Sequence, residues 1–473
     1  MQRIRLVASS TTERVLVLPV GEAAPALPDE ELRAFAADVE HTGEAGTTHV
    51  LPRPGRTPAR IALIGIGAGD EAGWRAAGAA AARTFADEAS ITVAMPDGVD
   101  ASAVRGVAEG LWLAGYRYRM PDTTAPEEKN IALAVDDVGR YEAALAVARA
   151  TAEATRFARD LTNTPSSLKD PAWFADQIRQ AADGRAGVTV TVHEPDQLAA
   201  EGFGGILAVG GGSARGPRLV ELGWRPAAAR THVVLVGKGI TFDTGGISIK
   251  THAGMTLMRK DMGGAAAILA ATLGAAALQL PVRVTALAPL AENMPSGSAF
   301  RPGDVVRHYG GMTSETPNSD AEGRLVLADV LAYAVHRLAP DLLVDLATLT
   351  GANVVALGKR TAALYSDSDD LAGALAAAAA EAGEQTWRMP LPADYVEYLG
   401  SEVADLVSWA DRGAGSVLAA LYLREFVGDL RDRWAHIDMS APSWSEADDR
   451  ELVKGATGWG VRTLLRWLPT LVV

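Results

Sequence analysis

Three short segments of the chain gather acidic and basic side chains among glycines. The first, residues 318–324 (Asn-Ser-Asp-Ala-Glu-Gly-Arg), places Asp320, Glu322 and Arg324 at alternate positions directly ahead of an apolar run. In an extended segment, residues two apart point to the same side, so we expect these three side chains to face one site. Acids gathered in this way repel one another unless cations lie between them.

The other two segments, between residues 238 and 264, supply more charged groups. Lys238, Asp243 and Lys250 lie in one, and Asp261 lies in the other. The glycines around them let the backbone turn tightly. Carboxylate oxygens are the ligands that hard divalent cations prefer, so the residue types alone indicate a metal site.

These segments resemble the leucyl aminopeptidase (cytosol aminopeptidase) family of dinuclear-metal exopeptidases. The hallmark of that family is Asn-Thr-Asp-Ala-Glu-Gly-Arg-Leu, from which residues 318–325 differ only in Ser319. Similar blocks follow in order from about Arg159 to Asp438, nearly the whole C-terminal two-thirds of the chain. The first 150 or so residues carry no comparable signature.

The resemblance implies a set of metal ligands. Asp243 and Glu322 would bridge two divalent ions, with Mn or Zn as the expected occupants. Lys238 and Asp261 would complete one site, and Asp320 the other through its carboxylate and its main-chain carbonyl. A lysine ligand must be neutral, so its pKa must fall well below the usual ~10.4. Two adjacent dications can lower it. The alternative for Lys238 is an exposed ammonium group that follows a strand.

The resemblance also implies catalytic and substrate-binding groups. Lys250 would stabilise the oxyanion of the tetrahedral intermediate. Arg324 would hold a bicarbonate ion that acts as general base and then as general acid; its alternative is an ion pair with Asp320 or Glu322. The residues expected to contact the substrate are Met258, whose alternative role is core packing, and Thr348, Leu349 and Gly351.

The function implied is hydrolysis of the N-terminal residue, preferably leucine or another apolar residue, from peptides with a free N-terminus. A homohexamer is the assembly implied. Two alternatives stay open: a two-metal phosphoesterase, because carboxylate-rich metal pairs also cleave phosphate esters, and a DNA-binding or scaffold protein on the peptidase fold. The formal charge of −14 argues against general affinity for nucleic acid.

The length of 473 residues predicts two domains. Strand and helix patterns alternate throughout, which predicts an α/β fold. We expect a small N-terminal α/β domain with parallel strands (residues 1–155) and a larger catalytic domain (residues 156–473) with a mixed central sheet flanked by helices. A helix near residues 141–160 would link them.

The chain contains no cysteine, which excludes thiolate metal sites and fits a reducing cytoplasm. Residues 1–10 lack the long apolar core of a secretory leader. The uncharged run 262–282 is about long enough to span a membrane, but its Ala and Gly content favours a buried helix instead. The predictions are therefore a cytoplasmic location and no membrane partner.

Three weaker patterns are better explained structurally. Residues 67–72 loosely fit a dinucleotide fingerprint, but the ribose-binding acid should lie ~20 residues on at the end of the second strand, and the obvious acid there, Asp97, comes later. Ser166 and Lys169 fit a Ser-x-x-Lys pattern without its partner motifs. None of the eight histidines forms His-Glu-x-x-His, so we interpret His436 as structural. Asp345 follows a strongly apolar strand, which favours a hydrogen-bonded structural acid over a metal ligand.

Overall fold

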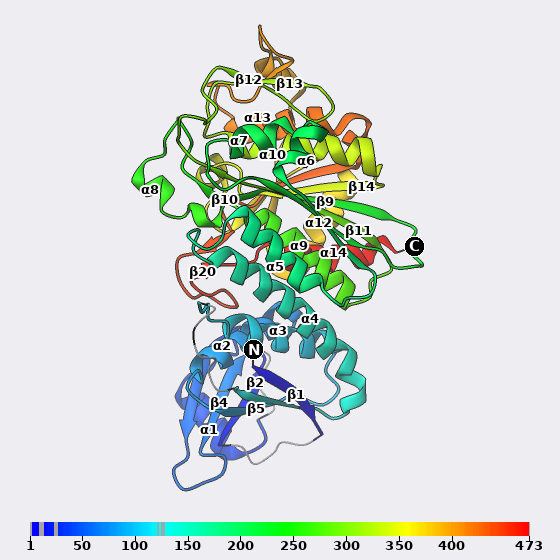
Figure 1. Cartoon of the computed structure of the whole chain (residues 1–473). Helices are drawn as coiled ribbons and strands as arrows, with labels where there is room; N and C mark the ends of the chain where they lie inside the picture. Colours follow the sequence, from blue (N-terminus) through cyan, green and yellow to red (C-terminus); the bar gives the residue numbers. More distant parts are fainter. Residues whose placement is uncertain (1, 9–13, 23–26, 121–122, 124–127, 473) are drawn as a thin grey trace. The chain divides into compact units, whose positions relative to one another are not determined.

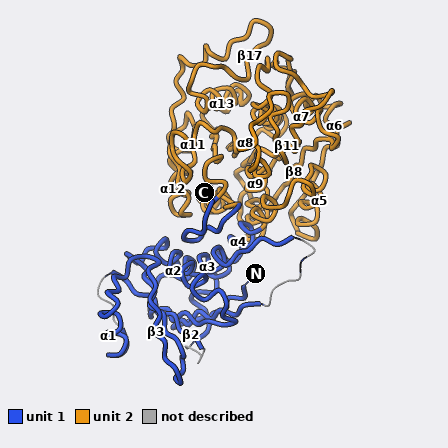
Figure 2. Tube along the Cα trace, turned by 90° about the vertical axis from the view of Figure 1, so that its left-hand side faces the viewer, with its two compact units in different colours: residues 1–156, 445–455 blue, residues 157–444, 456–473 orange. Residues whose placement is uncertain are grey.

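The described residues of the computed structural model divide into two compact units (Figure 2). One unit holds residues 1–156 with 445–455, and the other holds residues 157–444 with 456–473. Helix α4 (Val138–Asn163) contains the boundary. The sequence predicted domains of residues 1–155 and 156–473, so it did not assign residues 445–455 to the first unit. The ranges described are 2–8, 14–22, 27–120, 123 and 128–472.

A six-stranded sheet with the order β1-β6-β5-β2-β4-β3 forms the centre of the first unit. Its strands are parallel except at one edge, where β3 pairs antiparallel with β4. The prediction of parallel strands was wrong there, because the short connection 53–59 cannot make the crossover that parallel strands need. The elements are β1 (Arg3–Val7), β2 (Val15–Val20), α1 (Glu30–Asp38), β3 (Thr48–Pro52), β4 (Arg60–Gly65), α2 (Glu71–Thr84), β5 (Ser90–Ala94), α3 (Ala101–Ala114) and β6 (Asn130–Ala134).

A mixed nine-stranded sheet forms the centre of the second unit, with the order β16-β15-β18-β14-β9-β11-β8-β7 and β10 beside β11. Its middle strands β18, β14, β9 and β11 are parallel neighbours. The strands are β7 (Val188–His193), β8 (Arg218–Trp224), β9 (His232–Gly237), β10 (Gly239–Asp243), β11 (Arg283–Asn293), β14 (Leu342–Ala347), β15 (Thr361–Tyr365), β16 (Gln385–Arg388) and β18 (Trp434–Asp438).

Helices cover both faces of this sheet. Figure 1 shows α5, α9 and α14 on one face and α7, α10 and α13 on the other. The helices of the second unit are α5 (Pro171–Ala182), α6 (Pro195–Glu201), α7 (Gly204–Gly210), α8 (His252–Met255), α9 (Gly263–Ala277), α10 (Glu322–Tyr333), α11 (Ala352–Leu357), α12 (Asp369–Ala382), α13 (Gly415–Arg424) and α14 (Val461–Trp467).

Shorter elements complete this unit. A small three-stranded sheet joins β12 (Asp304–Arg307), β13 (Thr313–Thr316) and β17 (Leu406–Val407). The turns of 3-10 or π-helix are η1 (Met258–Lys260), η2 (Ala334–Leu338), η3 (Ala393–Leu399), η4 (Glu425–Arg433) and η5 (Leu468–Leu471). The short strands β19 (Trp444–Ser445) and β20 (Gly455–Ala456) pair with each other at the boundary between the two units.

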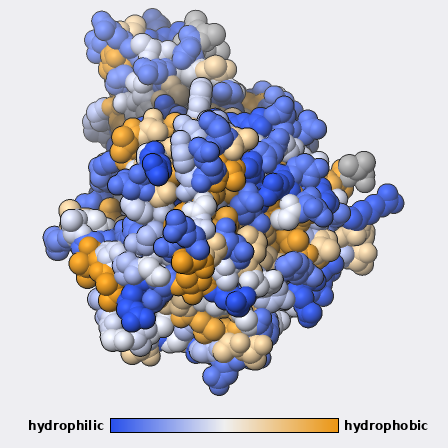
Figure 3. Space-filling model, turned by 90° about the horizontal axis from the view of Figure 1, so that it is seen from above, coloured by the Kyte–Doolittle hydropathy of each residue, from blue (hydrophilic) through white to orange (hydrophobic). Residues whose placement is uncertain are grey.

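Helix α9 is the uncharged run that could have been a membrane span. Fourteen of its fifteen residues are buried, and it packs against β8, β9, β11 and β14. The prediction of a buried helix is therefore confirmed. No helix in the described part of the chain has both the length and the apolar content to cross a membrane. The face shown in Figure 3 is mostly hydrophilic, with separate small hydrophobic patches.

Candidate metal centre and substrate site

Four parallel neighbouring strands end at the same edge of the central sheet. Lys238 follows β9, Asn293 ends β11, Thr348 follows β14 and Asp438 ends β18. In open α/β sheets, ligands bind outside the carboxyl ends of the strands. The polar residues that the sequence singled out therefore lie where this architecture places functional sites.

Four acids, here called the carboxylate cluster, lie at this edge: Asp243, Asp261, Asp320 and Glu322. Asp243 ends β10, Asp261 lies between η1 and α9, and Glu322 begins α10. Oxygens of Asp243, Asp320 and Glu322 lie within 4.8 Å of one another. Asp243, Asp261 and Glu322 are buried, whereas the Asp320 side chain is 34% exposed. Such closely spaced, buried acids need cations between them.

Two lysines supply positive charge to the cluster. The amine of Lys238 lies 2.9 Å from Asp261 Oδ2 and 2.8 Å from Glu322 Oε1. The amine of Lys250 lies 2.8 Å from Asp243 Oδ2 and 2.5 Å from Asp320 Oδ1. The Lys238 side chain is only 4% exposed, so the alternative of an exposed ammonium group is wrong.

The cluster has oxygen atoms free to bind a metal. Asp261 Oδ2, Asp320 Oδ1 and Glu322 Oε1 are buried and accept no hydrogen bond of ordinary geometry, although each lies close to a lysine amine. These contacts are ion pairs of 2.5 to 2.9 Å with the amines of Lys238 and Lys250. Buried oxygens that meet only lysine amines, contributed by three of the four converging acids, fit a site for hard divalent cations.

The charges of the cluster are incompletely balanced. Burial raises the pKa of Asp243 to about 6, and repulsion by Glu322 adds to the rise. Burial also raises the pKa values of Asp261 and Glu322. Burial alone would lower the pKa of Lys238, but attraction to Asp261, Glu322 and Asp243 outweighs it and raises that pKa. A metal ion ligated by Lys238 would have to compete with the proton on that amine, and the charge of dications would be needed to displace the proton.

Neighbouring polar groups orient the acids, a role that the sequence analysis did not assign to them. Asn293 Nδ2 donates to Asp243 Oδ1 at 2.8 Å and to the Ser319 carbonyl at 3.0 Å. Thr348 Oγ1 donates to Asp261 Oδ1 at 2.7 Å. Ser319, which replaces the Thr of the family hallmark, keeps a hydroxyl that donates to the Gly245 carbonyl at 2.7 Å. The sequence signal that could have indicated a role for Asn293 is its position at the end of a mostly apolar strand.

Arg324 lies in the first turn of helix α10 and not in an extended segment. Helix α10 begins at Glu322, and in a helix residues two apart point in different directions, so the extended-chain argument fails beyond Glu322. Arg324 Nη1 donates to the Ser408 carbonyl at 2.7 Å. Its Nε and the Ser408 hydroxyl are buried with no hydrogen-bond partner among the described residues. Nor does an ion pair join Arg324 to Asp320 or Glu322 in that part of the chain, which removes this alternative.

The residues expected to contact substrate lie in two segments of the chain. Met258 begins η1, three positions before Asp261, and is half-buried rather than part of the core. Residues 348–351, here called the 348–351 loop, follow β14; Thr348 is buried, Leu349 half-buried and Gly351 exposed. The Thr348 carbonyl accepts a hydrogen bond from the Lys238 amine at 3.2 Å. The loop therefore contacts the carboxylate cluster directly.

The weaker patterns have structural roles. Ser166 Oγ donates to the Thr241 carbonyl at 2.8 Å, while Lys169 is buried and donates to the carbonyls of Thr162 and Arg259. Asp345 accepts hydrogen bonds from Trp434 Nε1 at 2.8 Å and shares one with His436 Nδ1 at 2.5 Å. The structural interpretations of His436 and Asp345 are confirmed.

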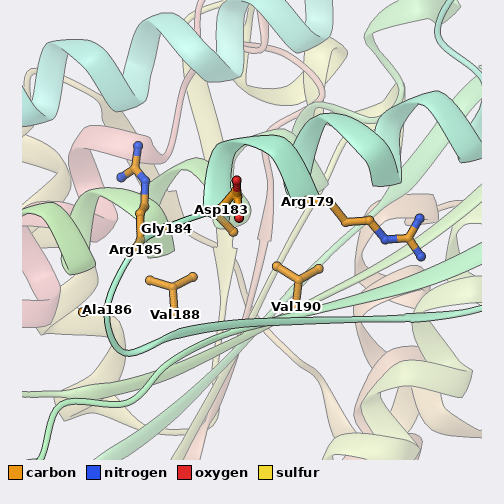
Figure 4. A pocket seen from close by; sticks show the side chains of 8 residues that line it. Arg179, Asp183, Gly184, Arg185, Ala186, Val188 and Val190 are labelled. Carbon is orange, nitrogen blue, oxygen red and sulfur yellow. The ribbon is translucent and has the colours of Figure 1, made fainter.

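A surface hollow of about 410 Å³ lies elsewhere, between the end of α5 and strand β7 (Figure 4). Arg179, Asp183 and Val190 line it, and no member of the carboxylate cluster does. Arg179 is already paired with Asp176 at 2.9 Å and with Glu194 at 3.7 Å. The hollow is open and Arg179 is already paired, so it does not compete with the cluster as the functional site.

A buried carboxylate–lysine cluster at the carboxyl ends of parallel strands defines an α/β enzyme of the metal-dependent class. Residues 156–465 match the catalytic domain of the cytosol aminopeptidase family, and residues 11–120 match the N-terminal domain of that family. The chain belongs to the cytosol aminopeptidase family, whose members are hydrolases that act on peptides. The resemblance, the two-domain α/β fold and the assignment to peptide hydrolases are thereby confirmed.

Individual relatives cover nearly the whole chain. A probable cytosol aminopeptidase of Streptomyces coelicolor is 42% identical over 95% of this chain and 92% of its own length. One from Micrococcus luteus is 43% identical over 93% of this chain and 91% of its own length. The solved structure of the bottromycin maturation enzyme BotP in complex with Mn is 40% identical, with a TM-score of 0.88, covering 97% of this chain and 99% of that chain.

Proposed function

We propose that this aminopeptidase uses two divalent ions to remove the N-terminal residue, preferably leucine or another apolar residue, from peptides. The observation that carries the proposal is the carboxylate cluster, in which four acids converge on two lysines in a mostly buried site. Residues 156–473 would form the catalytic domain and residues 1–155 a separate N-terminal domain.

The metal ligands would be those of the family. Asp243 and Glu322 would be shared by both ions, Lys238 and Asp261 would complete one site, and Asp320 the other. The three clustered oxygens within 4.8 Å of one another support sharing. Bound ions would supply Lewis acidity toward a peptide carbonyl and a water nucleophile. The Mn in the BotP structure supports Mn as an occupant, with Zn as the other candidate.

Lys250 and Arg324 would provide the remaining chemistry. Lys250 reaches Asp243 and Asp320 from a position that is 16% exposed, so its ammonium could also reach an oxyanion at the mouth of the cluster. The free Nε of Arg324 and the free hydroxyl of Ser408 support an anion site. Arg324 would hold a bicarbonate there, and the bound anion would supply general base and general acid chemistry.

The substrate pocket would be formed by Met258 and the 348–351 loop. Methionine adapts to irregular apolar shapes, and its half-buried side chain near Asp261 suits a leucine-like residue. The hydrogen bond from Lys238 to the Thr348 carbonyl places the loop beside the cluster. Main-chain groups of Leu349 and Gly351 would bind the peptide backbone.

For the oligomeric state and the cellular location, we propose those expected for the family. We propose a homohexamer in the cytoplasm; the relatives are named cytosol aminopeptidases, and the chain has no cysteine. A phosphoesterase would use the same acids, but the family assignment favours peptides. The net charge of −14 speaks against the DNA-binding alternative.

Two chromogenic substrates distinguish the enzyme classes. With Mn present, purified protein is expected to hydrolyse leucine p-nitroanilide and to leave p-nitrophenyl phosphate unchanged. Hydrolysis of the phosphate ester alone would refute the peptidase proposal in favour of the phosphoesterase.

A further inference from the structure

Asp438, the last residue of β18, has a carboxylate whose hydrogen bonds are almost all to one loop. Its Oδ2 accepts from the Thr350 amide at 3.0 Å and the Thr350 hydroxyl at 2.7 Å. Its Oδ1 accepts from the amides of Leu349 and Ser440, both at 3.1 Å. The side chain is buried, with 1% of the residue exposed. Three of the four donors thus belong to the 348–351 loop.

Ser440 adds a second link to the same loop. Its hydroxyl donates to the Thr350 carbonyl at 2.6 Å, and its own carbonyl accepts from the Lys260 amine at 2.7 Å. At the other end of the loop, Thr348 bonds to Lys238 and Asp261. The loop is therefore fixed at one end by the carboxylate cluster and at the other by Asp438.

The surroundings of Asp438 are unusual for a buried acid. No lysine, arginine or histidine lies within ion-pairing distance of it among the described residues. A buried carboxylate is costly unless hydrogen bonds compensate it, and amide donors to a charged oxygen make strong ones. Here the hydrogen bonds come from three backbone amides and the Thr350 hydroxyl, and Lys260, Arg324 and His436 add attraction from beyond ion-pairing distance. The acid and the conformation of the loop therefore depend on each other.

We propose that Asp438 is a positioning residue for peptide binding: its carboxylate holds the 348–351 loop in the conformation that presents its main-chain groups to the substrate. This inference rests on the proposed function, in which the loop contacts the peptide. Asp438 itself touches neither the carboxylate cluster nor the reacting atoms, and it acts through Leu349 and Thr350.

The test uses the isosteric variant Asp438→Asn in the full-length protein. An amide offers one acceptor oxygen, and its NH₂ group faces the amides of the loop, so the loop loses its anchor. We expect hydrogen exchange of the Leu349 and Thr350 amides to accelerate at least about tenfold. The KM for leucine p-nitroanilide should rise at least about tenfold with a smaller change in kcat. Mn affinity, measured by calorimetry, should stay within about twofold of wild type.

The matched control is Asp345→Asn, which alters a buried acid on the neighbouring strand that bonds only to Trp434 and His436. It should leave loop exchange and KM unchanged. Thr350→Val removes a single hydrogen bond to Asp438 and should raise KM by a smaller factor with Mn affinity kept. It serves as the test if Asp438→Asn does not fold.

Three results would overturn the proposal: unchanged exchange of the loop amides, unchanged KM despite faster exchange, or loss of Mn affinity together with the rate. The exchange measurement does not depend on catalysis. Wild-type protein that fails to cleave leucine p-nitroanilide would contradict the proposed function, whereas the anchoring of the loop would still be decided by exchange.

Discussion

Replacing Gly323 by alanine should damage the metal centre without disturbing the helix that carries it. Gly323 follows Glu322 in the first turn of α10. A Cβ at this position would lie 2.5 Å from Cε, 2.7 Å from Nζ and 2.8 Å from Cδ of Lys238. Non-bonded carbon atoms normally stay about 3.5–4.0 Å apart, so the end of Lys238 must retreat by about 1 Å.

The loss of catalytic rate caused by this displacement of Lys238 can be estimated. The amine of Lys238 lies 2.8 Å from Glu322 and 2.9 Å from Asp261, and its side chain is 4% exposed, so it has no solvent-filled space to enter. A displacement of about 1 Å at a catalytic group costs roughly 10²-fold in rate, or about 2.7 kcal/mol of activation free energy. We expect kcat/KM for leucine p-nitroanilide to fall by about 100-fold and Mn affinity, measured by calorimetry, to fall with it.

The control is Gly373→Ala in α12, where a Cβ meets no atom within 4 Å. It should leave activity unchanged and stabilise the protein by about 0.5–1 kcal/mol, since alanine favours helix over glycine. If Gly323→Ala binds Mn and cleaves substrate as wild type does, Lys238 is not tied to the metal centre and the ligand assignment is wrong.

The remaining predictions concern metals, residue roles, substrate and assembly. Dialysis against a chelator should abolish activity and added Mn or Zn should restore it; full activity in metal-free protein would contradict the proposal. Asp261→Asn and Glu322→Gln should lose metal and activity together, whereas Lys250→Ala should bind metal normally and lose about 10²–10³ in rate. If Lys238→Ala kept its metals while Lys250→Ala lost them, the two roles would be exchanged. Leu-Gly-Gly should be hydrolysed and acetyl-Leu-Gly-Gly should not, because acetylation removes the free amine; equal turnover of both by chromatography would indicate another amidase. Light scattering should give six chains, and a fully active monomer at dilute concentration would refute the hexamer.

The sequence predicted the charged residues of the site well because they are concentrated in three short segments. Asp243, Asp320 and Glu322 do converge, and Lys238, Lys250 and Asp261 join them. Glycine-flanked acids in otherwise apolar segments have few explanations other than a shared cation, so residue type and local spacing supported the metal site, and the family resemblance supplied the ligand set.

What the sequence did not predict depends on contacts between distant segments. Asn293 orients Asp243 across 50 residues, and Asp438 holds Thr350 across 88 residues. The argument that treated residues 320–324 as one extended segment did not hold for Arg324, because helix α10 starts at Glu322. Local pattern cannot reveal which loops meet at the edge of a sheet, since that is set by the strand order.

The most direct test of the central claim is a crystal structure of Mn-loaded protein with the Mn located by anomalous scattering. The account predicts two peaks per chain inside the carboxylate cluster, both in contact with Asp243 and Glu322, with Lys238 and Asp261 touching one and Asp320 the other. A single Mn peak per chain at full occupancy, or Mn peaks away from these five residues, would contradict the two-metal account.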